Sequence, residues 1–173
     1  GCIKLSDITM SKSIRDIYAS AFASCESLTR IEIPDSVTYI PASAFAWCSN
    51  LSGFKLPNQV KWIDDNAFLG CKKLKNLTFP ETLLLIGKNA FKQCGLIGDI
   101  IIPESVKIID DMAFYKCNLE SITLYNRSII LNDYCLGEPL ADVTIYTYED
   151  SEGDYYATSY RLQCVYLDDD FNQ

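Results

Sequence analysis

The chain has 173 residues, of which 49% are hydrophobic, and it carries 23 acidic and 15 basic side chains for a formal net charge of −8 at pH 7. This length suits one ordinary domain. Phosphate recognition needs clustered Lys and Arg, whereas the basic residues here are scattered, so we expect no nucleic-acid partner. The apolar runs are far shorter than the roughly 20 residues of a membrane-spanning helix, so we expect no direct membrane insertion.

The first residues continue a pattern that has already begun. Gly1 to Lys4 show no basic segment followed by a long apolar stretch, and so no signal peptide is predicted. Cys2 occupies the position of later in-phase cysteines, with Leu5 and Ile8 following in register. We therefore interpret the chain as a fragment, or a processed form, of a longer protein whose first repeat is partial.

One frame recurs along the chain in steps of 23 residues. Its Ala-Phe pairs begin at Ala21, Ala44, Ala67, Ala90 and Ala113, its cysteines are Cys2, Cys25, Cys48, Cys71, Cys94 and Cys117, and its prolines are Pro34, Pro57, Pro80 and Pro103. A fixed period in this range is typical of stacked coils, a solenoid.

Each repeat begins with a predicted strand, as in residues 28–34. Ile31 and Ile33 alternate with Arg30 and Glu32, which is the period-2 pattern of a half-buried strand. Proline has no backbone donor and ends the strand. We expect each strand to pair in parallel with the strand of the next coil, so that stability becomes a sum of neighbour interfaces.

A second extended piece follows each proline, as in residues 60–63. It has only three to four residues, and we expect little more than a bridge on the opposite side of the coil. After it, residues 64–71 place Ala67, Phe68 and Cys71 on one helical turn, expected to be 3₁₀-like, behind an acidic start. The paired acids Asp64-Asp65 and Asp110-Asp111 are therefore interpreted as capping groups rather than catalytic carboxylates.

The cysteines are predicted to be a column of buried thiols. Stacking sets their side chains parallel and about 5 Å apart, whereas a disulfide needs converging Cβ vectors. Zinc is disfavoured because the chain has no histidine and no Cys-x-x-Cys pair. Cys135 and Cys164 stand outside the column, and whether they form a disulfide is left open.

Residues 74–80 and 86–94 carry the frame Leu-x-x-Leu-x-Phe-Pro followed by Ile-Gly-x-x-Ala-Phe-x-x-Cys. This frame resembles the 23-residue repeat of BspA-like, or Treponema-type, leucine-rich repeat proteins, over about residues 2–145. The resemblance implies a right-handed leucine-rich repeat solenoid with a parallel sheet on its concave face. It also implies a cell-surface or secreted protein that acts in adhesion or host-protein binding, with no enzymatic activity and no cofactor.

The pattern weakens toward the end of the chain. After Cys117 the apolar positions come one residue early, and residues 140–145 are the last predicted repeat strand. We therefore divide the chain into a solenoid (1–145), with a partial first and a degenerate last repeat, and a capping segment (146–173). In the cap we expect an acidic turn at 146–154 and an edge strand at 160–167. The acidic runs 150–154 and 168–170 are interpreted as solvated turns in preference to calcium sites, since neither has EF-hand spacing.

The chain lacks histidine, the commonest general base, and we expect no catalytic residue and no metal site. If the fold is as predicted, a protein partner, such as a host extracellular or plasma protein, would bind the outward strand positions of the concave face. These positions are Asp7, Thr9, Arg30, Glu32, Gly53, Lys55, Asn76, Thr78, Asp99, Ile101, Ser121 and Thr123. They include a mixed-charge patch at Arg30, Glu32 and Lys55 but no aromatic anchor. An ordinary solvated surface, on repeats that serve only as a spacer for another domain, is the alternative.

Overall fold

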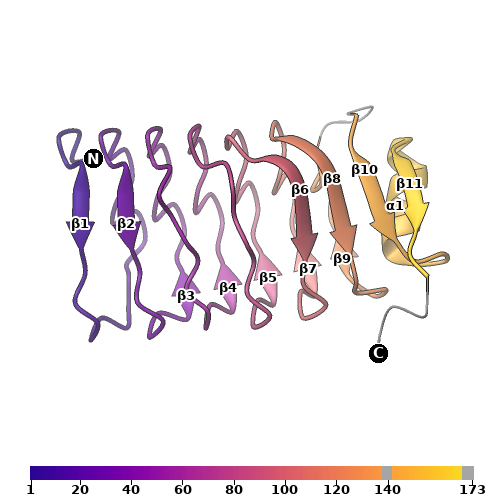
Figure 1. Cartoon of the computed structure of the whole chain (residues 1–173), viewed down its shortest axis with the longest axis horizontal. Coiled ribbons are helices and arrows are strands. Elements are labelled where there is room, and N and C mark those ends of the chain that lie inside the picture. The colour runs from indigo at the N-terminus through magenta and orange to yellow at the C-terminus, as the bar shows by residue number, and fades with distance from the viewer. Residues whose placement is uncertain (138–141, 169–173) are drawn as a thin grey trace.

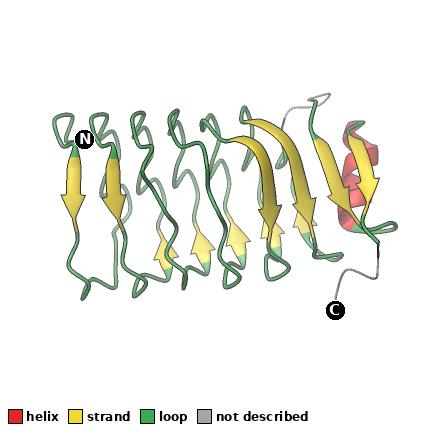
Figure 2. Ribbon diagram, viewed as in Figure 1, coloured by secondary structure: helices red, strands yellow, loops and turns green. Residues whose placement is uncertain are grey.

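The computed structural model describes residues 1–137 and 142–168. The chain winds into an elongated solenoid whose coils stack from the N-terminal end to the C-terminal end (Figures 1 and 2). Strands lie on two faces, and all described strand pairs are parallel. The expected solenoid of parallel-strand coils is confirmed. No helix in the described ranges is long and apolar enough to cross a membrane.

The first face is the face on which the long repeat strands were predicted. It carries β1 (Asp7–Thr9), β2 (Arg30–Glu32), β6 (Ile97–Ile102), β8 (Asn118–Leu124), β10 (Thr144–Thr147) and β11 (Gln163–Tyr166). β1 pairs with β2, and β6, β8, β10 and β11 form a four-stranded sheet. The prediction that every coil pairs its strand with the next is wrong for the two coils between β2 and β6. There the described chain keeps only an isolated bridge between Arg30 and Gly53.

The inward side chains explain this interruption. The regular strands place β-branched residues inward, such as Ile31 in β2 and Ile100 in β6, and these residues favour a pleated strand. The two irregular coils place Phe54 and Phe79 inward instead. A ring fills more space than an Ile side chain and lies edge-on against the phenylalanine column, so it holds the backbone away from the spacing that ladder hydrogen bonds need.

The second face carries an unbroken sheet. Its five parallel strands are β3 (Tyr39–Ile40), β4 (Trp62–Ile63), β5 (Leu85–Ile86), β7 (Ile108–Ile109) and β9 (Ile130–Leu131). Each strand has only two residues, as short as predicted, yet the sheet runs through five coils. Paired residues in neighbouring strands are 23 positions apart in the sequence at each step from Tyr39 to Ile108, and 22 positions apart between Ile108 and Ile130. The repeat after Cys117 is thus one residue shorter, as its apolar pattern indicated.

The Ala-Phe segments form the corner between the two faces. Within one turn the bonds are of the i→i−3 type, as when the Ala44 amide donates to the Pro41 carbonyl at 3.1 Å. The next amide, of Phe45, donates instead to the Ala67 carbonyl of the neighbouring coil at 2.8 Å. Because alternate amides donate across coils, the predicted 3₁₀-like turns remain single turns and never join into a helix. These inter-coil hydrogen bonds form a third ladder along the solenoid axis, in addition to those of the two faces.

Two columns fill the interior behind this corner. Phe22, Phe45, Phe68, Phe91 and Phe114 stack with ring centroids 5.2–5.4 Å apart. Beside them the thiols of Cys48, Cys71, Cys94 and Cys117 each donate to the carbonyl of a phenylalanine one coil back, for example Cys71 Sγ to Phe45 O at 3.1 Å and Cys94 Sγ to Phe68 O at 2.9 Å. The predicted column of buried thiols is confirmed for Cys25, Cys48, Cys71 and Cys94, whereas Cys117 is half-buried and Cys2, in the outermost coil, is exposed.

The C-terminal segment differs from its prediction in one element. The edge strand is present as β11, and a turn is present at residues 149–150, but β10 extends into the start of the predicted turn 146–154 and a helix, α1 (Glu152–Tyr160), begins within its end. Ser151 is the N-cap, and its hydroxyl accepts a hydrogen bond from the Asp154 amide. The helix contains three Tyr, one Gly and one Thr, which have weak helix propensity. The local sequence indicates this helix only through the Ser-x-x-Asp capping pattern. Residues 140–141 of the predicted last strand and residues 169–170 of the acidic run lie outside the described residues.

Cys135 and Cys164, whose pairing the sequence left open, are free thiols. Cys135 is fully buried, and burial raises its pKa to about 12. It lies close to Tyr156 of α1, whose hydroxyl accepts a hydrogen bond from the Leu136 amide at 3.3 Å. The cap is therefore joined to the last coil by packing and hydrogen bonds.

Candidate functional site: a groove on the first face

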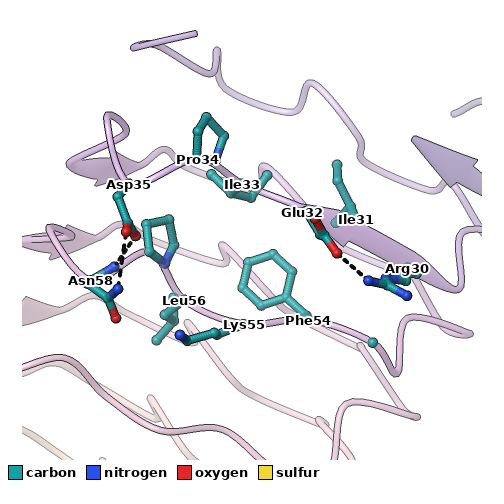
Figure 3. Close-up of a pocket in the computed structure, with 12 residues that line it drawn as sticks. Arg30, Ile31, Glu32, Ile33, Pro34, Asp35, Phe54, Lys55, Leu56 and Asn58 are labelled. Atoms are coloured by element: carbon teal, nitrogen blue, oxygen red, sulfur yellow. Dashed lines mark hydrogen bonds and ion pairs between the residues drawn. The ribbon is translucent and has the colours of Figure 1, made fainter. Parts of the chain in front are cut away.

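The interruption of the first sheet creates a groove between two neighbouring coils (Figure 3). Residues 30–35 form one wall and residues 53–58 the other, around a volume of about 570 Å³. Ile31, Ile33, Phe54 and Leu56 form its apolar base, and charged side chains stand at its rim.

Hydrogen bonds join the two walls at both ends of the groove. At one end the Gly53 amide donates to the Thr29 carbonyl at 3.0 Å, and the Ile31 amide donates to the Gly53 carbonyl at 3.4 Å. A Cβ at Gly53 would lie 3.2 Å from Arg30 Cγ, so glycine permits this close approach. At the other end the Asn58 amide and Nδ2 donate to the two carboxylate oxygens of Asp35, at 2.7 and 3.1 Å (Figure 3). The splayed strands are thus held in place on both sides.

The backbone between these ties has free hydrogen-bonding capacity. Within the described residues, the amides of Phe54, Lys55 and Leu56 donate to no other protein group. Phe54 is packed edge-on against Phe45 and Phe68, at centroid distances of 5.2 and 4.9 Å, and keeps this strand from closing on β2. Main-chain donors at the surface of a sheet can pair with an added extended segment.

The charges at the rim are unevenly matched. Arg30 and Glu32 form an ion pair across the outer surface of β2. The hydrogen bond to Glu32, together with the charge of that carboxylate, raises the pKa of Arg30. Lys55 on the opposite wall is exposed and lies in no ion pair among the described residues. The groove therefore presents one internally compensated ion pair, the positive charge of Lys55, and the carboxylate of Asp35, which accepts hydrogen bonds from Asn58 but lies in no ion pair among the described residues.

The structure brings four of the predicted residues to this groove, Arg30, Glu32, Gly53 and Lys55. The others are spread over the rest of the first face. Asn76, Thr78, Asp99 and Ile101 are exposed, whereas Thr123 is half-buried and Ser121 is buried. The Ser121 hydroxyl donates to Asp99 Oδ1 at 2.6 Å, so these two side chains satisfy each other across β8 and β6.

A smaller hollow of about 350 Å³ lies where the last coils meet the cap. It is lined by Glu81, Ile101, Pro103, Glu104, Tyr125, Tyr148 and Leu167. Ile101 links it to the predicted binding positions, but its aromatic residues were not predicted because they come from the degenerate repeat and the cap.

The acidic pairs lie at the coil corners as local hydrogen-bond acceptors. Asp64 Oδ1 accepts from the Asp65 amide at 2.8 Å, and Asp110 Oδ1 accepts from the Asp111 amide at 2.7 Å. Each bond goes to the amide of the next residue and not to the N2 or N3 amide that an N-cap binds, and Asp65 Oδ1 accepts from the Lys88 amide of the next coil at 2.9 Å, so the capping role stays a prediction. Among residues 1–137 and 142–168, no group of three or more acidic or cysteine side chains is arranged to hold a metal ion.

The sequence reasoning missed the exposed aromatic side chains of the second face. Tyr39 and Trp62 point outward from β3 and β4, each 41% exposed. The sequence does indicate this row, because Tyr39 and Trp62 are 23 residues apart and occupy the same position of the repeat. It was overlooked because the short second strand was treated as a mere bridge.

Comparison with known proteins places these features in a family. A family model described as BspA type leucine rich repeat region matches residues 1–97 and 85–171, with six copies. A leucine-rich repeat protein from Bacteroides ovatus superposes with a TM-score of 0.76 at 28% identity, over 94% of this chain and 43% of that one. A leucine-rich repeat protein from T. pallidum superposes with a TM-score of 0.64 at 28% identity, over 81% of this chain and 73% of that one.

The chain thus spans less than half of the Bacteroides ovatus protein that it resembles. A comparison with curated proteins gives no match. The family model covers nearly the whole chain. The chain belongs to the BspA-type leucine-rich repeat family.

Proposed function

We propose that the chain is a non-enzymatic protein-interaction module of a cell-surface or secreted repeat protein, and that it binds its partner through the first face. The groove between residues 30–35 and 53–58 carries this proposal, because it combines an apolar base, charged rims and unpaired backbone amides. Leucine-rich repeat proteins are in general protein-interaction scaffolds, which supports the same class of function. A role in adhesion, with a host extracellular or plasma protein as partner, follows from the resemblance of the repeat.

The form of the groove favours an extended segment of the partner. Amides of Phe54, Lys55 and Leu56 can donate to the main chain of such a segment, as in other cases of strand addition to a sheet. Lys55 would then pair with an acidic side chain of the partner, since it has no carboxylate partner in the described chain. Main-chain bonds would give affinity, and the charged rim would give orientation.

The test is capture of extracellular-matrix and plasma proteins on the immobilised chain. A groove variant replaces Arg30, Glu32 and Lys55 with alanine. A control variant carries Lys12→Ala, Glu26→Ala and Lys72→Ala, which change the net charge by the same amount at exposed positions outside the groove. We expect a partner that the parent and the control capture and that the groove variant loses.

Two other outcomes would contradict the proposal. Capture by all three proteins alike would place recognition away from the groove. Capture by none above background would favour a spacer, in which the regularly stacked coils hold another domain at a distance. Urea unfolding of each variant shows whether a loss of binding reflects loss of the fold.

A further inference from the structure

An unbroken apolar ladder runs along the second face. The outward residues of its five paired strands are Tyr39, Trp62, Leu85, Ile108 and Ile130, and each is in register with the next. Tyr39 and Trp62 are 41% exposed and Ile130 is 54% exposed, while Leu85 and Ile108 are half-buried. Single exposed apolar residues are ordinary, but a contiguous row of large ones marks an interaction surface.

Charged residues flank this ladder with opposite signs on its two sides. Lys61 and Lys107 precede the ladder residues of β4 and β7, and both are exposed. Lys61 Nζ lies over the Trp62 ring, 6.0 Å from its centroid. The amine of Lys61 therefore lies next to the aromatic part of the ladder.

On the other side an acidic row follows the same strands. It consists of Asp64, Asp65, Asp110 and Asp111, and it is interrupted in the coil of β5 by Lys88, which pairs with Asp111 at 2.9 Å. The Tyr39 hydroxyl donates to Asp64 Oδ2, which places this row on the same face as the ladder. That hydrogen bond raises the pKa of Tyr39 to about 12, so Tyr39 is uncharged at neutral pH.

The order basic row, apolar ladder, acidic row has a consequence for self-association. Two identical faces that meet are related by a two-fold axis lying between them. An axis parallel to the strands would reverse the order of the coils and set the basic row against the basic row and the acidic row against the acidic row. An axis parallel to the solenoid would instead reverse the strands of the second copy, so that each basic row meets an acidic row and Trp62 meets Trp62.

We propose that the second face binds the second face of another copy of this chain, coil against coil, about a two-fold axis parallel to the solenoid. The apolar ladder is buried at the centre of the contact, where aromatic side chains contribute most to affinity. Lys61 and Lys107 face the acidic rows of the partner copy. The charge pattern fixes this arrangement and disfavours the alternative axis, in which like charges would meet.

This pairing leaves both first faces exposed on opposite sides of the dimer. The dimer is a property of the second face and stands whether or not the groove binds a partner. If the groove does bind, two copies presented together would raise the effective affinity for a repetitive surface without any new contact.

Sedimentation velocity over a concentration series tests the association. The parent is compared with a charge-reversed variant, Lys61→Glu with Lys107→Glu, and with a control, Lys12→Glu with Lys72→Glu, which has the same net charge at exposed positions off this face. We expect the parent and the control to form a dimer, and the charge-reversed variant to raise the dissociation constant at least about tenfold because glutamate would then oppose aspartate. A parent that stays monomeric at every concentration, or a control weakened as much as the charge-reversed variant, would overturn the proposal.

Carbodiimide cross-linking of a mixture of ¹⁵N-labelled and unlabelled chains tests the geometry, because this reagent joins amines to carboxylates in direct contact. Coil-on-coil pairing predicts mixed-isotope cross-links from Lys61 to Asp64 or Asp65, and from Lys107 to Asp110 or Asp111. The Lys88–Asp111 pair lies within one chain and supplies an internal positive control that carries a single isotope. A dimer whose mixed-isotope links join other residues would overturn the proposed axis.

Discussion

The two faces of the solenoid come from the same repeat, yet their sheets differ in continuity. On the second face the inward residues are nearly uniform, with Ile40, Ile63, Ile86 and Ile109 followed by Leu131. On the first face the equivalent inward position changes from Ile31 to Phe54, Leu77 and Ile100.

Parallel strands must keep a spacing of about 4.8 Å to hold their ladder, and identical inward side chains stack easily at that spacing. On the first face Phe54 interrupts this column and Phe79 interrupts the neighbouring column of Ile33, Leu56 and Ile102, and the ladder is absent in these two coils. The continuity of the sheet therefore depends on the uniformity of its inward columns more than on the length of its strands.

The phenylalanine column lies in the core between the two faces, so removing one ring should have the largest effect on the free energy of unfolding. Phe68 is fully buried between Phe45 and Phe91, with Phe54 edge-on against it. We expect Phe68→Ala to lower the free energy of unfolding by about 3–5 kcal/mol, because the lost contacts leave a cavity. Urea unfolding measures it.

Tyr18→Ala is the control for this change, since Tyr18 is 81% exposed and its removal should cost no more than about 0.5 kcal/mol. Equal midpoints for Phe68→Ala and the parent would refute the importance of the column.

The continuous end of the first face depends on the cap, which makes Ser151 the next test. Its buried hydroxyl accepts from the Asp154 amide, donates to the Tyr148 carbonyl at 2.6 Å and lies 2.9 Å from Thr147 Oγ1. Ser151→Ala should cost about 0.5–2 kcal/mol, the usual range for loss of an N-cap. Ser159→Ala removes an exposed hydroxyl from the same helix and should be nearly neutral in the same thermal or urea unfolding measurement. An equal cost for both substitutions would contradict the capping role.

The thiol column predicts a fall of stability at high pH. Burial raises the pKa of Cys48 and Cys117 from 9.0 to about 12 and also raises the pKa of Cys94. A folded-state pKa above the unfolded value means that the stabilisation is full below pH 9 and is lost as the pH rises toward 12.

Urea midpoints measured between pH 8 and pH 11 should therefore decrease. Cys117→Ala should show a shallower decrease than the parent, since one such group has been removed. Parallel curves for the two proteins would show that other groups govern the alkaline transition.

The last prediction involves no substitution and concerns the hydrogen-exchange rates of amides on the first face. The amides of Phe54, Lys55 and Leu56 lack ladder bonds, whereas Ile100 and Ile102 lie in the paired strand β6. Unpaired surface amides exchange through small local fluctuations, so the first group should exchange much faster in the native protein. Residue-resolved exchange by NMR measures this. Equal protection in the two groups would mean that the first sheet is closed in solution.

Much of the fold could be predicted from the sequence because it depends on period. The Ala-Phe pairs, cysteines and prolines recur every 23 residues, and a coil that repeats must stack its equivalent residues in columns. The phenylalanine column, the buried thiols and the shortened repeat after Cys117 all follow from this arithmetic. So does the family, since the model of the repeat matches the chain from end to end.

The tertiary structure decided what depends on size and on contacts between coils. The sequence named Arg30, Glu32 and Lys55 together, but it could not show that Phe54 forces their strands apart and opens a groove. Nor could it show that two-residue strands would join into a five-stranded sheet with an exposed apolar row, since each strand alone is too short to give a pattern. Helix α1 could not be predicted from the sequence for a related reason. Its weak propensity is overcome by packing of Tyr156 and Ala157 onto the last coil, an interaction that no local stretch of sequence contains.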